Sequence, residues 1–189
     1  SSDLSFGSIP LLNDAARGIG PEANVIFDYA RRLGMTWQAI PLTRSGYRKM
    51  NKGRMEAIVD ISQIRATYQP GHTHADFFTY ELRIDGKPFI VDAGTSTYDK
   101  GLRRDYERST KAHNTVSVEG KDSCEVWSGF RVGKRPKIHI VADFEDQIEA
   151  WHNGFGKGLT HSRDFSVHEP VFCVTDKISK SRESVSYIH

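Results

Sequence analysis

Residues 79–92 read TYELRIDGKPFIVD, and this stretch predicts an antiparallel β-hairpin. Apolar and β-branched residues alternate with polar residues on both sides of the dipeptide Asp85-Gly86, as they do in strands that bury one face. Asp and Gly also tolerate the positive φ angles that a two-residue turn requires. We therefore expect the fold to be built on antiparallel strands.

Short runs of the same kind lie on both sides of the hairpin. They are rich in β-branched and aromatic residues, and turn residues separate them. The runs lie at 57–68, 77–84, 88–93, 114–120, 135–145, 164–168 and 171–179. This spacing predicts a mainly β fold, an antiparallel β-sandwich.

The N-terminal part has a different pattern, which predicts a short helix. Between Pro21 and Gly34 apolar residues recur at three- and four-residue intervals, namely Val25, Ile26, Tyr29, Ala30 and Leu33. Gly34 stands where a helix C-cap is expected. We expect residues 1–50 to be a helical tail or linker and residues 51–189 to form the β-sandwich domain.

Composition excludes some classes of partner. The chain has 189 residues, and its 26 Lys and Arg are balanced by 24 Asp and Glu that are scattered along the sequence. This pattern does not favour nucleic acid. No apolar run approaches the ~20 residues that cross a bilayer, and the N-terminus lacks a basic start before an apolar stretch. Cys124 and Cys173 allow at most one disulfide, which leaves the redox compartment undecided.

The densest chemical signal is GHTHADF, residues 71–77. On an extended strand His72, His74 and Asp76 would share one face, because side chains alternate with a period of two. A single His needs no explanation beyond a hydrogen bond. Two His one residue apart match the strand period, and neutral imidazole is a common ligand of divalent metals. Metal binding and plain hydrogen bonding are both open here.

Two further polar residues stand at the ends of predicted strands, where ligands can converge. Asp92 ends an apolar strand, and His113 begins another. Taken alone, Asp92 is explained as a cap of the turn at Ala93-Gly94. His113 and Asn114, taken alone, are explained as a polar pair that ends a loop.

Together, residues 71–98 and 103–120 resemble the signature region of the heparinase II/III-like polysaccharide lyases. These stretches read GHTHADFFTYELRIDGKPFIVDAGTSTY and RRDYERSTKAHNTVSVEG. Residues 9–34 resemble, less specifically, the end of that family's helical toroid and the linker that leaves it. The resemblance implies that the chain is the C-terminal β-sandwich part of such a lyase.

The resemblance also implies roles for individual residues. In the family the second His of the His-x-His pair binds zinc, and the first lies at the substrate groove. Carried over, the ligands of one structural zinc are His74, Asp92 and His113, and the catalytic groove residue is His72. The residues that match further family positions, and are expected to bind substrate, are Arg104, Arg108 and Asn114.

The activity implied by the resemblance is β-elimination on an anionic, uronic-acid-containing polysaccharide such as heparin, heparan sulfate or alginate. The reaction removes the proton at C5, neutralises the carboxylate and protonates the leaving oxygen. The family's acid/base Tyr comes from the toroid, so we expect this chain alone to be inactive. Tyr80, Tyr98 and Tyr106 are better explained by packing or as loop anchors. The resemblance further implies a periplasmic or secreted protein.

Geometry places a condition on the zinc site. Continuing the hairpin register past its turn places Thr79 opposite Asp92. Five extended residues would then carry His74 ~16 Å away, whereas zinc accepts bonds of ~2.0–2.2 Å. We therefore predict a bend or bulge between His74 and Phe77, with Asp76 as an acceptor that orients a ring.

Two other classes remain open. A cupin-type metalloenzyme also uses a His-x-His pair, but it favours Glu four or five residues later, where Phe78 and Thr79 stand. A carbohydrate-binding module would stack sugars on exposed aromatic rings. Its candidates are Trp127, Trp151 and Phe155. Exposed apolar surface and sheet edges would also make a homo-oligomer a reasonable expectation.

Overall fold

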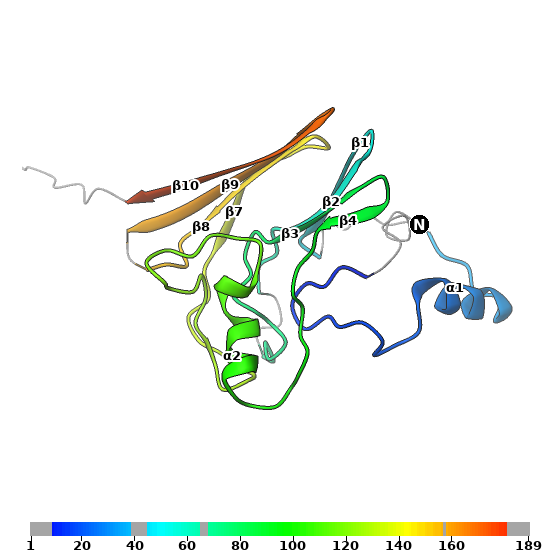
Figure 1. The fold of residues 1–189 in the computed structure, drawn as a ribbon, viewed down its shortest axis with the longest axis horizontal. Helices are drawn as coiled ribbons and strands as arrows, with labels where there is room; N and C mark the ends of the chain where they lie inside the picture. The colour runs from blue at the N-terminus through cyan, green and yellow to red at the C-terminus, as the bar shows by residue number, and fades with distance from the viewer. Residues whose placement is uncertain (1–8, 39–44, 65–67, 157, 181–189) are drawn as a thin grey trace, which may run out of the picture.

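The computed structural model describes residues 9–38, 45–64, 68–156 and 158–180. Within these residues the chain is mainly β, with antiparallel sheets and two short α-helices (Figure 1). The predicted fold class is therefore confirmed. Neither helix in the described part of the chain has the length and apolar character needed to span a membrane.

Two four-stranded sheets form the body of the protein. The first has the order β1 (Tyr47–Lys52), β2 (Met55–Asp60), β3 (Tyr80–Ile84), β4 (Lys87–Ile90). The second has the order β10 (Val171–Lys180), β9 (Leu159–His168), β8 (Gln147–His152), β7 (Ile138–Asp143). The connection between them carries α2 (Leu102–Arg108), a 3-10 turn (Thr110–Ala112), β5 (Val126–Trp127) and β6 (Arg131–Val132).

The predicted hairpin is β3–β4. Its turn residues Asp85 and Gly86 have φ angles of 52° and 70°. Ile84 pairs with Lys87, as the two-residue turn requires. The left-handed backbone at both positions explains why Asp-Gly stands there.

A β-bulge then changes the register that the sequence predicted. Leu82 pairs with Ile90, and the pairing shifts between Leu82 and Arg83. The ladder ends before Thr79 and Asp92, so these two do not form the expected backbone pair. Their side chains still meet, because Thr79 Oγ1 donates a hydrogen bond to Asp92 Oδ2.

The apolar core lies between the two sheets. Alternate residues of β2 point inward, as do alternate residues of β8 and β9. The buried members of this core are Met50, Met55, Ala57, Val59, Ile61, Phe78, Leu82, Ile148, Ala150, Phe165 and Val167. The alternation that predicted strands is thus the alternation that fills the sandwich.

The outer face of the first sheet is covered by the N-terminal segment, residues 9–16, which runs beside β3 and β4 (Figure 1). Leu12 packs on Ile58, which points away from the main core. The Leu11 N–H donates to the Glu81 carboxylate at 2.8 Å. This segment, assigned from sequence to a tail, therefore forms part of the sandwich surface.

Three local expectations differ from the structure. Residues 114–120 form no strand beyond one bridge between Val118 and Lys121, because Glu119 and Gly120 both adopt positive φ and turn the chain. Strand β8 was not predicted. Strand β1 was not predicted either, and it crosses the expected boundary between residues 50 and 51. Both strands alternate buried residues with polar ones, so their apolar content is low.

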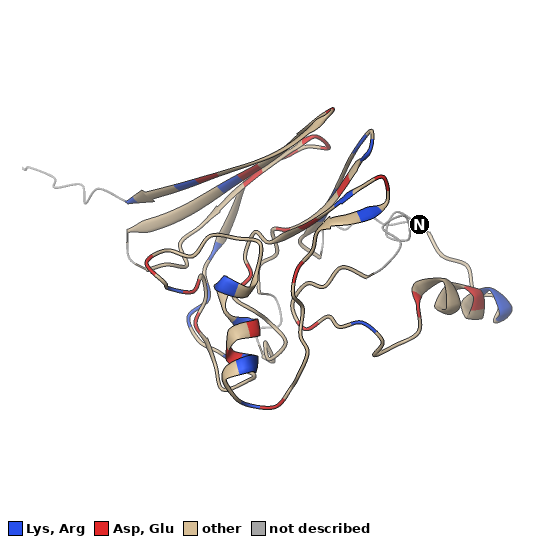
Figure 2. Cartoon of the chain, viewed as in Figure 1, with Lys and Arg blue, Asp and Glu red and all other residues tan. Residues whose placement is uncertain are grey.

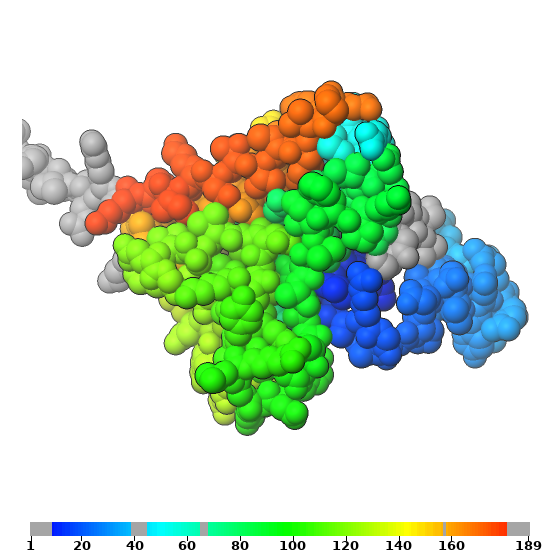
Figure 3. Space-filling model, viewed as in Figure 1, coloured from blue at the N-terminus to red at the C-terminus, as the bar shows by residue number. Residues whose placement is uncertain are grey.

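The predicted N-terminal helix is present as α1 (Ala23–Arg32), and Gly34 follows it with φ of 70°. None of its residues is buried. Figure 3 shows it at one side of the molecule, outside the two sheets. Acidic and basic residues are interspersed over helices and strands (Figure 2).

Candidate functional site

The His-x-His segment bends away from the sheet, as predicted. Residues 71–79 contain no strand, and Phe78, which is fully buried, has a φ of 65°. A left-handed, non-glycine residue in a core is uncommon and marks a constrained site. The Phe78 N–H donates to the Asp60 carbonyl at 3.0 Å, which holds the bend.

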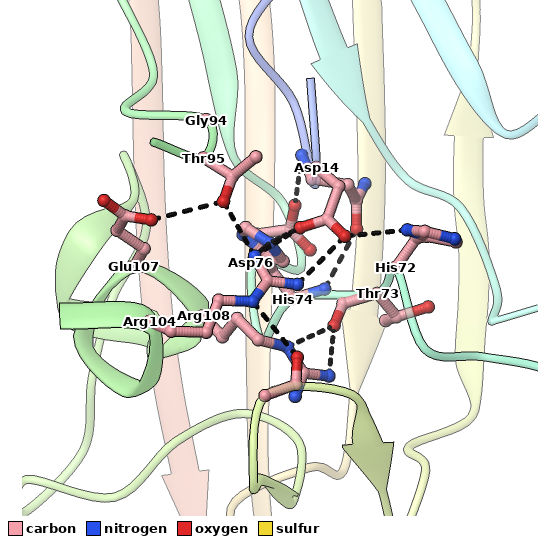
Figure 4. A network of polar contacts seen from close by, with 12 residues as sticks. Asp14, His72, Thr73, His74, Asp76, Gly94, Thr95, Arg104, Glu107 and Arg108 are labelled. Carbon is pink, nitrogen blue, oxygen red and sulfur yellow. Dashed lines mark hydrogen bonds and ion pairs between the residues drawn. The ribbon is translucent and has the colours of Figure 1, made fainter. Parts of the chain in front are cut away.

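Asp14 is the centre of the polar network shown in Figure 4. It accepts hydrogen bonds from His72 Nδ1 at 2.8 Å, His74 Nε2 at 2.7 Å and Arg104 Nη2 at 2.9 Å. Burial alone would raise the pKa of Asp14, but the hydrogen bonds from His74, Arg104 and His72 hold that pKa well below its usual range. Asp14 is therefore a fixed negative charge.

His72 is the exposed member of this network. Its side chain is 68% exposed. Because its Nδ1 donates to Asp14, its Nε2 carries the lone pair, and no residue in the described part of the chain bonds to that atom. A neutral imidazole held in this way can take a proton from a molecule that approaches from solvent.

His74, His113 and Asp92 are brought together, as the sequence predicted. All three side chains are buried. His113 Nδ1 lies 2.7 Å from Asp92 Oδ1, and His74 Nδ1 lies 3.3 Å from His113 Nε2. Asp14 accepts from His74 Nε2, and Asp92 accepts from His113 Nδ1. The lone pairs of the two remaining nitrogens, His74 Nδ1 and His113 Nε2, then face each other, and this arrangement attracts a cation.

The electrostatics of this pair favour positive charge between the rings. Burial lowers the pKa of His113, but the hydrogen bond to Asp92 and the charges of Asp76 and Asp92 outweigh it, so the pKa is raised. Burial raises the pKa of Asp92, and the bonds from His113 and Thr79 bring it below its ordinary value. A proton or a metal ion between the rings would satisfy both nitrogens.

The separation of the two nitrogens fits zinc. Two ligands on a tetrahedral zinc with bonds of about 2.0–2.1 Å stand roughly 3.3 Å apart. The Asp92 oxygen lies at the other nitrogen of the His113 ring, where it orients the ring. Among the residues described, no group of three or more His, Cys, Asp and Glu is arranged to hold a metal. The two imidazoles of His74 and His113 therefore fit as zinc ligands. That Asp92 is a direct zinc ligand stays a prediction.

Arg104 and Arg108 stand four residues apart on α2, so both point to the same side. They are 0% and 1% exposed. Besides Asp14, Arg104 donates to Thr95 Oγ1 at 2.8 Å, and Arg108 donates to the Thr73 carbonyl at 2.8 Å. Their burial does not favour the direct contact with substrate that the sequence suggested. They hold the loops of the site in place.

Asn114 also makes internal bonds. Its Nδ2 donates to the carbonyls of Tyr80 and Val91, at 3.0 and 2.9 Å, and so joins the ends of β3 and β4. Its own carbonyl accepts a hydrogen bond from Arg163 Nη1 at 2.6 Å. Asn114 therefore closes the open end of the hairpin beside Asp92.

Comparison with protein families matches the model "Heparinase II/III-like, C-terminal" over residues 34–189. The chain belongs to the heparinase II/III-like family. Comparison with curated proteins gives no match.

Solved structures of heparinases have the same fold. The heparinase III BT4657 gene product superposes with a TM-score of 0.66 at 17% identity, covering 94% of this chain and 30% of that protein. A mutant of the heparan sulfate lyase HepC from Pedobacter heparinus gives 0.64 at 17%, with the same coverage. This heparinase II/III-like chain thus spans about 30% of the length of the solved relatives it matches.

Two site residues of this heparinase II/III-like domain escaped the sequence reasoning. Asp14 lies ahead of the matched range, in the segment taken for a tail. Arg163 is buried on β9 and donates to the Phe78 carbonyl at 2.8 Å, while it pairs with Asp176. His161 and Arg163 lie two residues apart on β9 and both point inward. Their spacing in the sequence matches the strand period and could have indicated a buried polar cluster.

A second pair of imidazoles lies inside the sandwich at that polar end. His152 Nε2 is 3.1 Å from His161 Nδ1, and His161 Nε2 is 2.6 Å from Asp176. The Gly154 N–H donates to His152 Nδ1. Burial and then the charges of His161 and Arg163 lower the pKa of His152 to about 3. His152 is therefore neutral, and both rings are hydrogen-bonded.

Aromatic side chains surround the exposed imidazole. The His72 ring lies 6.0 Å from Tyr98 and 6.4 Å from Phe130, and the Arg104 guanidinium sits beneath both rings. Of the aromatic residues first considered for sugar stacking, Phe155 is buried and Trp151 stacks on His139 at 4.0 Å. Trp127 is exposed.

Proposed function

We propose that this chain forms the zinc-bearing, groove-lining part of a polysaccharide lyase that cleaves an anionic, uronic-acid-containing polysaccharide by β-elimination. The observation that carries the proposal is the exposed His72 imidazole, held by the buried Asp14 beside the paired His74 and His113 rings. Family membership supports the reaction class. Because such polymers lie outside cells, the proposal includes a periplasmic or secreted location.

His72 has the geometry for proton transfer. Its Nε2 faces solvent and can take a proton from the sugar or hold one for it. The positive charge that then develops on the ring is stabilised by Asp14 at the other nitrogen. In the resting state the positive charge of Arg104 pairs with the Asp14 carboxylate and keeps it ionised.

In this proposal His74 and His113 bind one zinc ion, and Asp92 contacts the His113 ring at the same centre. When bound, the zinc supplies a fixed positive charge that organises the loops of the groove. Asp14 and Asp92 hold the two rings in the tautomers that leave His74 Nδ1 and His113 Nε2 as donors. The ring contacts thereby fix the segment that carries His72.

Metal analysis tests the centre. We expect about one zinc per chain, and loss of zinc in His74→Ala and in His113→Ala. Asp92→Asn should weaken zinc affinity by about 10- to 100-fold, as expected when an orienting carboxylate is removed. The matched control is the exposed His168→Ala, which should keep full zinc content. Full zinc content in His74→Ala would contradict the assignment.

Activity tests the reaction. The chain alone, incubated with heparan sulfate or alginate, should produce no ultraviolet absorbance from unsaturated uronate. A longer protein that joins this chain to its helical domain should produce it. There His72→Ala should lower kcat by about 10²- to 10⁴-fold with unchanged zinc content. Absorbance from the chain alone would overturn the inactivity, and full activity of His72→Ala would overturn its role.

A further inference from the structure

The side chain of Arg163 connects the second sheet to the two chain segments that carry the proposed zinc ligands. Arg163 lies on β9 and is 4% exposed. Its Nη1 donates one hydrogen bond to the Phe78 carbonyl at 2.8 Å and another to the Asn114 carbonyl at 2.6 Å. Phe78 follows His74 by four residues, and Asn114 follows His113 directly. One nitrogen therefore ties the two ligand segments together.

Both of these carbonyls belong to residues that act on the zinc centre through their neighbours. Phe78 has a left-handed φ of 65°, which a buried residue other than glycine keeps only where its surroundings determine it. The next residue, Thr79, donates from its hydroxyl to Asp92 Oδ2 and accepts from the Asn114 N–H at 3.1 Å. A shift at Phe78 therefore reaches Asp92 through Thr79. A shift at Asn114 moves the preceding residue, His113.

The second sheet in turn fixes the position of Arg163. Its Nε and Nη2 donate to the two carboxylate oxygens of Asp176 on β10, each at 2.7 Å. Asp176 Oδ1 also accepts a hydrogen bond from His161 Nε2 at 2.6 Å, and His161 Nδ1 lies 3.1 Å from His152 Nε2. These bonds join β8, β9 and β10, so the guanidinium is held in one place.

The positive charge of Arg163 is balanced at the same place. Burial would raise the pKa of Asp176, but the hydrogen bonds from His161 and Arg163 hold that pKa well below its usual range. Asp176 is therefore ionised, and its charge offsets that of Arg163. The effect of Arg163 on the ligand segments then comes from where its nitrogens stand and not from its net charge.

We infer that Arg163 is a positioning residue of the zinc centre, because its guanidinium holds the two ligand segments at the spacing that zinc requires. The inference rests on the proposed function, since it takes His74 and His113 as zinc ligands. Their facing nitrogens stand 3.3 Å apart, which is roughly the spacing of two ligands on a tetrahedral zinc. Ligands that their surroundings hold at this spacing lose less freedom when the metal binds, so the affinity for zinc is higher.

Two replacements of Arg163 separate position from charge. Arg163→Lys keeps the charge beside Asp176, but lysine offers its donors from one nitrogen, whereas the guanidinium uses three nitrogens for its bonds. Arg163→Met removes the donors, and Asp176, whose side chain is 27% exposed, can then turn to solvent. In both variants zinc affinity should fall by about 10- to 100-fold, the usual effect of removing a group that orients metal ligands. Competition with a coloured zinc chelator measures the affinity.

Cobalt gives a readout that a loss of stability alone does not change. Co²⁺ can replace zinc, and its visible absorption depends on the geometry of its ligands. At saturating cobalt the visible bands of Arg163→Lys should differ in position or intensity from those of wild type.

The matched control is Arg48→Lys. Arg48 is also buried and also donates from Nε and Nη2 to one carboxylate, that of Asp143, each at 2.8 Å. These bonds join β1 to β7. Arg48→Lys should be less stable to urea than wild type but should keep the zinc affinity and the cobalt bands of wild type.

The measurements on wild type separate the two ways of failing. If wild type binds zinc, then wild-type zinc affinity in either Arg163 variant overturns the inference alone. Unchanged cobalt bands in Arg163→Lys, or an equal loss of zinc affinity in Arg48→Lys, would also overturn it. A wild type that binds neither metal refutes the zinc centre of the proposed function, and the role of Arg163 with it.

Discussion

Asp14 bonds to His72, His74 and Arg104, which follow it in the chain by 58, 60 and 90 residues. It is the counter-charge of an arginine that has no exposed surface. Sequence patterns found the histidines because two of them share a strand period. They did not find Asp14, because an isolated Asp in an irregular segment has no periodic neighbours and its partners are all distant.

Replacement of Asp14 tests its importance to the fold. Asp14→Ala leaves the Arg104 charge buried without a partner, so we expect the free energy of unfolding to fall by about 3–5 kcal/mol. Urea denaturation measures this fall. The control is Asp28→Ala, which removes the exposed ion pair with Arg31. This change should lower the free energy of unfolding by less than about 1 kcal/mol.

The same variant tests the tautomer of His72. Nitrogen NMR shifts of the wild-type ring should show a protonated Nδ1, because Asp14 accepts from that atom. In Asp14→Ala the signal of a protonated Nδ1 should be lost. A tautomer that does not change would contradict the proposed positioning role.

Asp60 predicts a pH dependence of stability. Burial, and then the charge of Asp76, raise its pKa to about 7 from the ordinary 3.8. The folded state then binds the proton more tightly than the unfolded state, so Asp60 lowers stability as pH rises from about 4 to about 7. Asp60→Asn should remove this part of the decline, since an amide oxygen can still accept from the Ser62 N–H.

Thermal unfolding of Asp60→Asn and wild type across that range measures the difference. The variant should gain stability relative to wild type as pH rises. Parallel curves for the two proteins would show that the Asp60 carboxyl titrates normally.

Among the elements, those with strong local signals were predictable. The Asp-Gly turn and α1 were found because turn chemistry and helical periodicity are local properties. Strands β1 and β8 were missed because their outward residues are charged or polar. The strand expected at 114–120 was wrong, since the β-branched residues there line a loop that Asn114 ties to the hairpin. The bulge in β3–β4 depends on packing that no local pattern encodes.

The docking of the N-terminal segment on the β3–β4 end can be measured with a pair of glycines. Gly94 and Gly86 have similar left-handed φ angles of 60° and 70°. A Cβ on Gly94 would lie 2.3 Å from the Ala15 carbonyl oxygen, whereas one on Gly86 would meet nothing within 4 Å. Gly86→Ala should cost about 1 kcal/mol from backbone strain alone.

Gly94→Ala should lower the free energy of unfolding by about 1–3 kcal/mol more than Gly86→Ala, because the N-terminal segment must move away from the new Cβ. The bond from the Thr95 N–H to Ala15 should also open. Urea denaturation and hydrogen exchange of Thr95 measure these effects. Equal losses for the two variants would show that the segment does not press on this turn.

At the scale of the whole molecule, α1 presents an apolar stripe that the sandwich does not cover. Val25, Ile26, Tyr29 and Leu33 are each more than half exposed. Such a stripe favours association. We expect the chain to self-associate as its concentration rises, and Ile26→Glu with Leu33→Glu to reduce this.

Sedimentation velocity over a concentration series measures the association. The control changes the same charge at two exposed polar positions, Asn24→Glu with Asn51→Glu, and should leave association unchanged if the stripe is the contact. Equal loss in both double variants would assign the effect to net charge.

The contact between Asp14 and Arg104 also sets an order of events during biosynthesis. Asp14 leaves the ribosome 90 residues ahead of its arginine, which at ~5–20 residues per second is a delay of roughly 5–18 s. By the end of that interval β1 to β4 have been made and Asp14 can already contact His72 and His74, but the arginine that balances its charge is still missing. The N-terminal segment of a nascent chain therefore completes its polar contacts only after α2 has emerged.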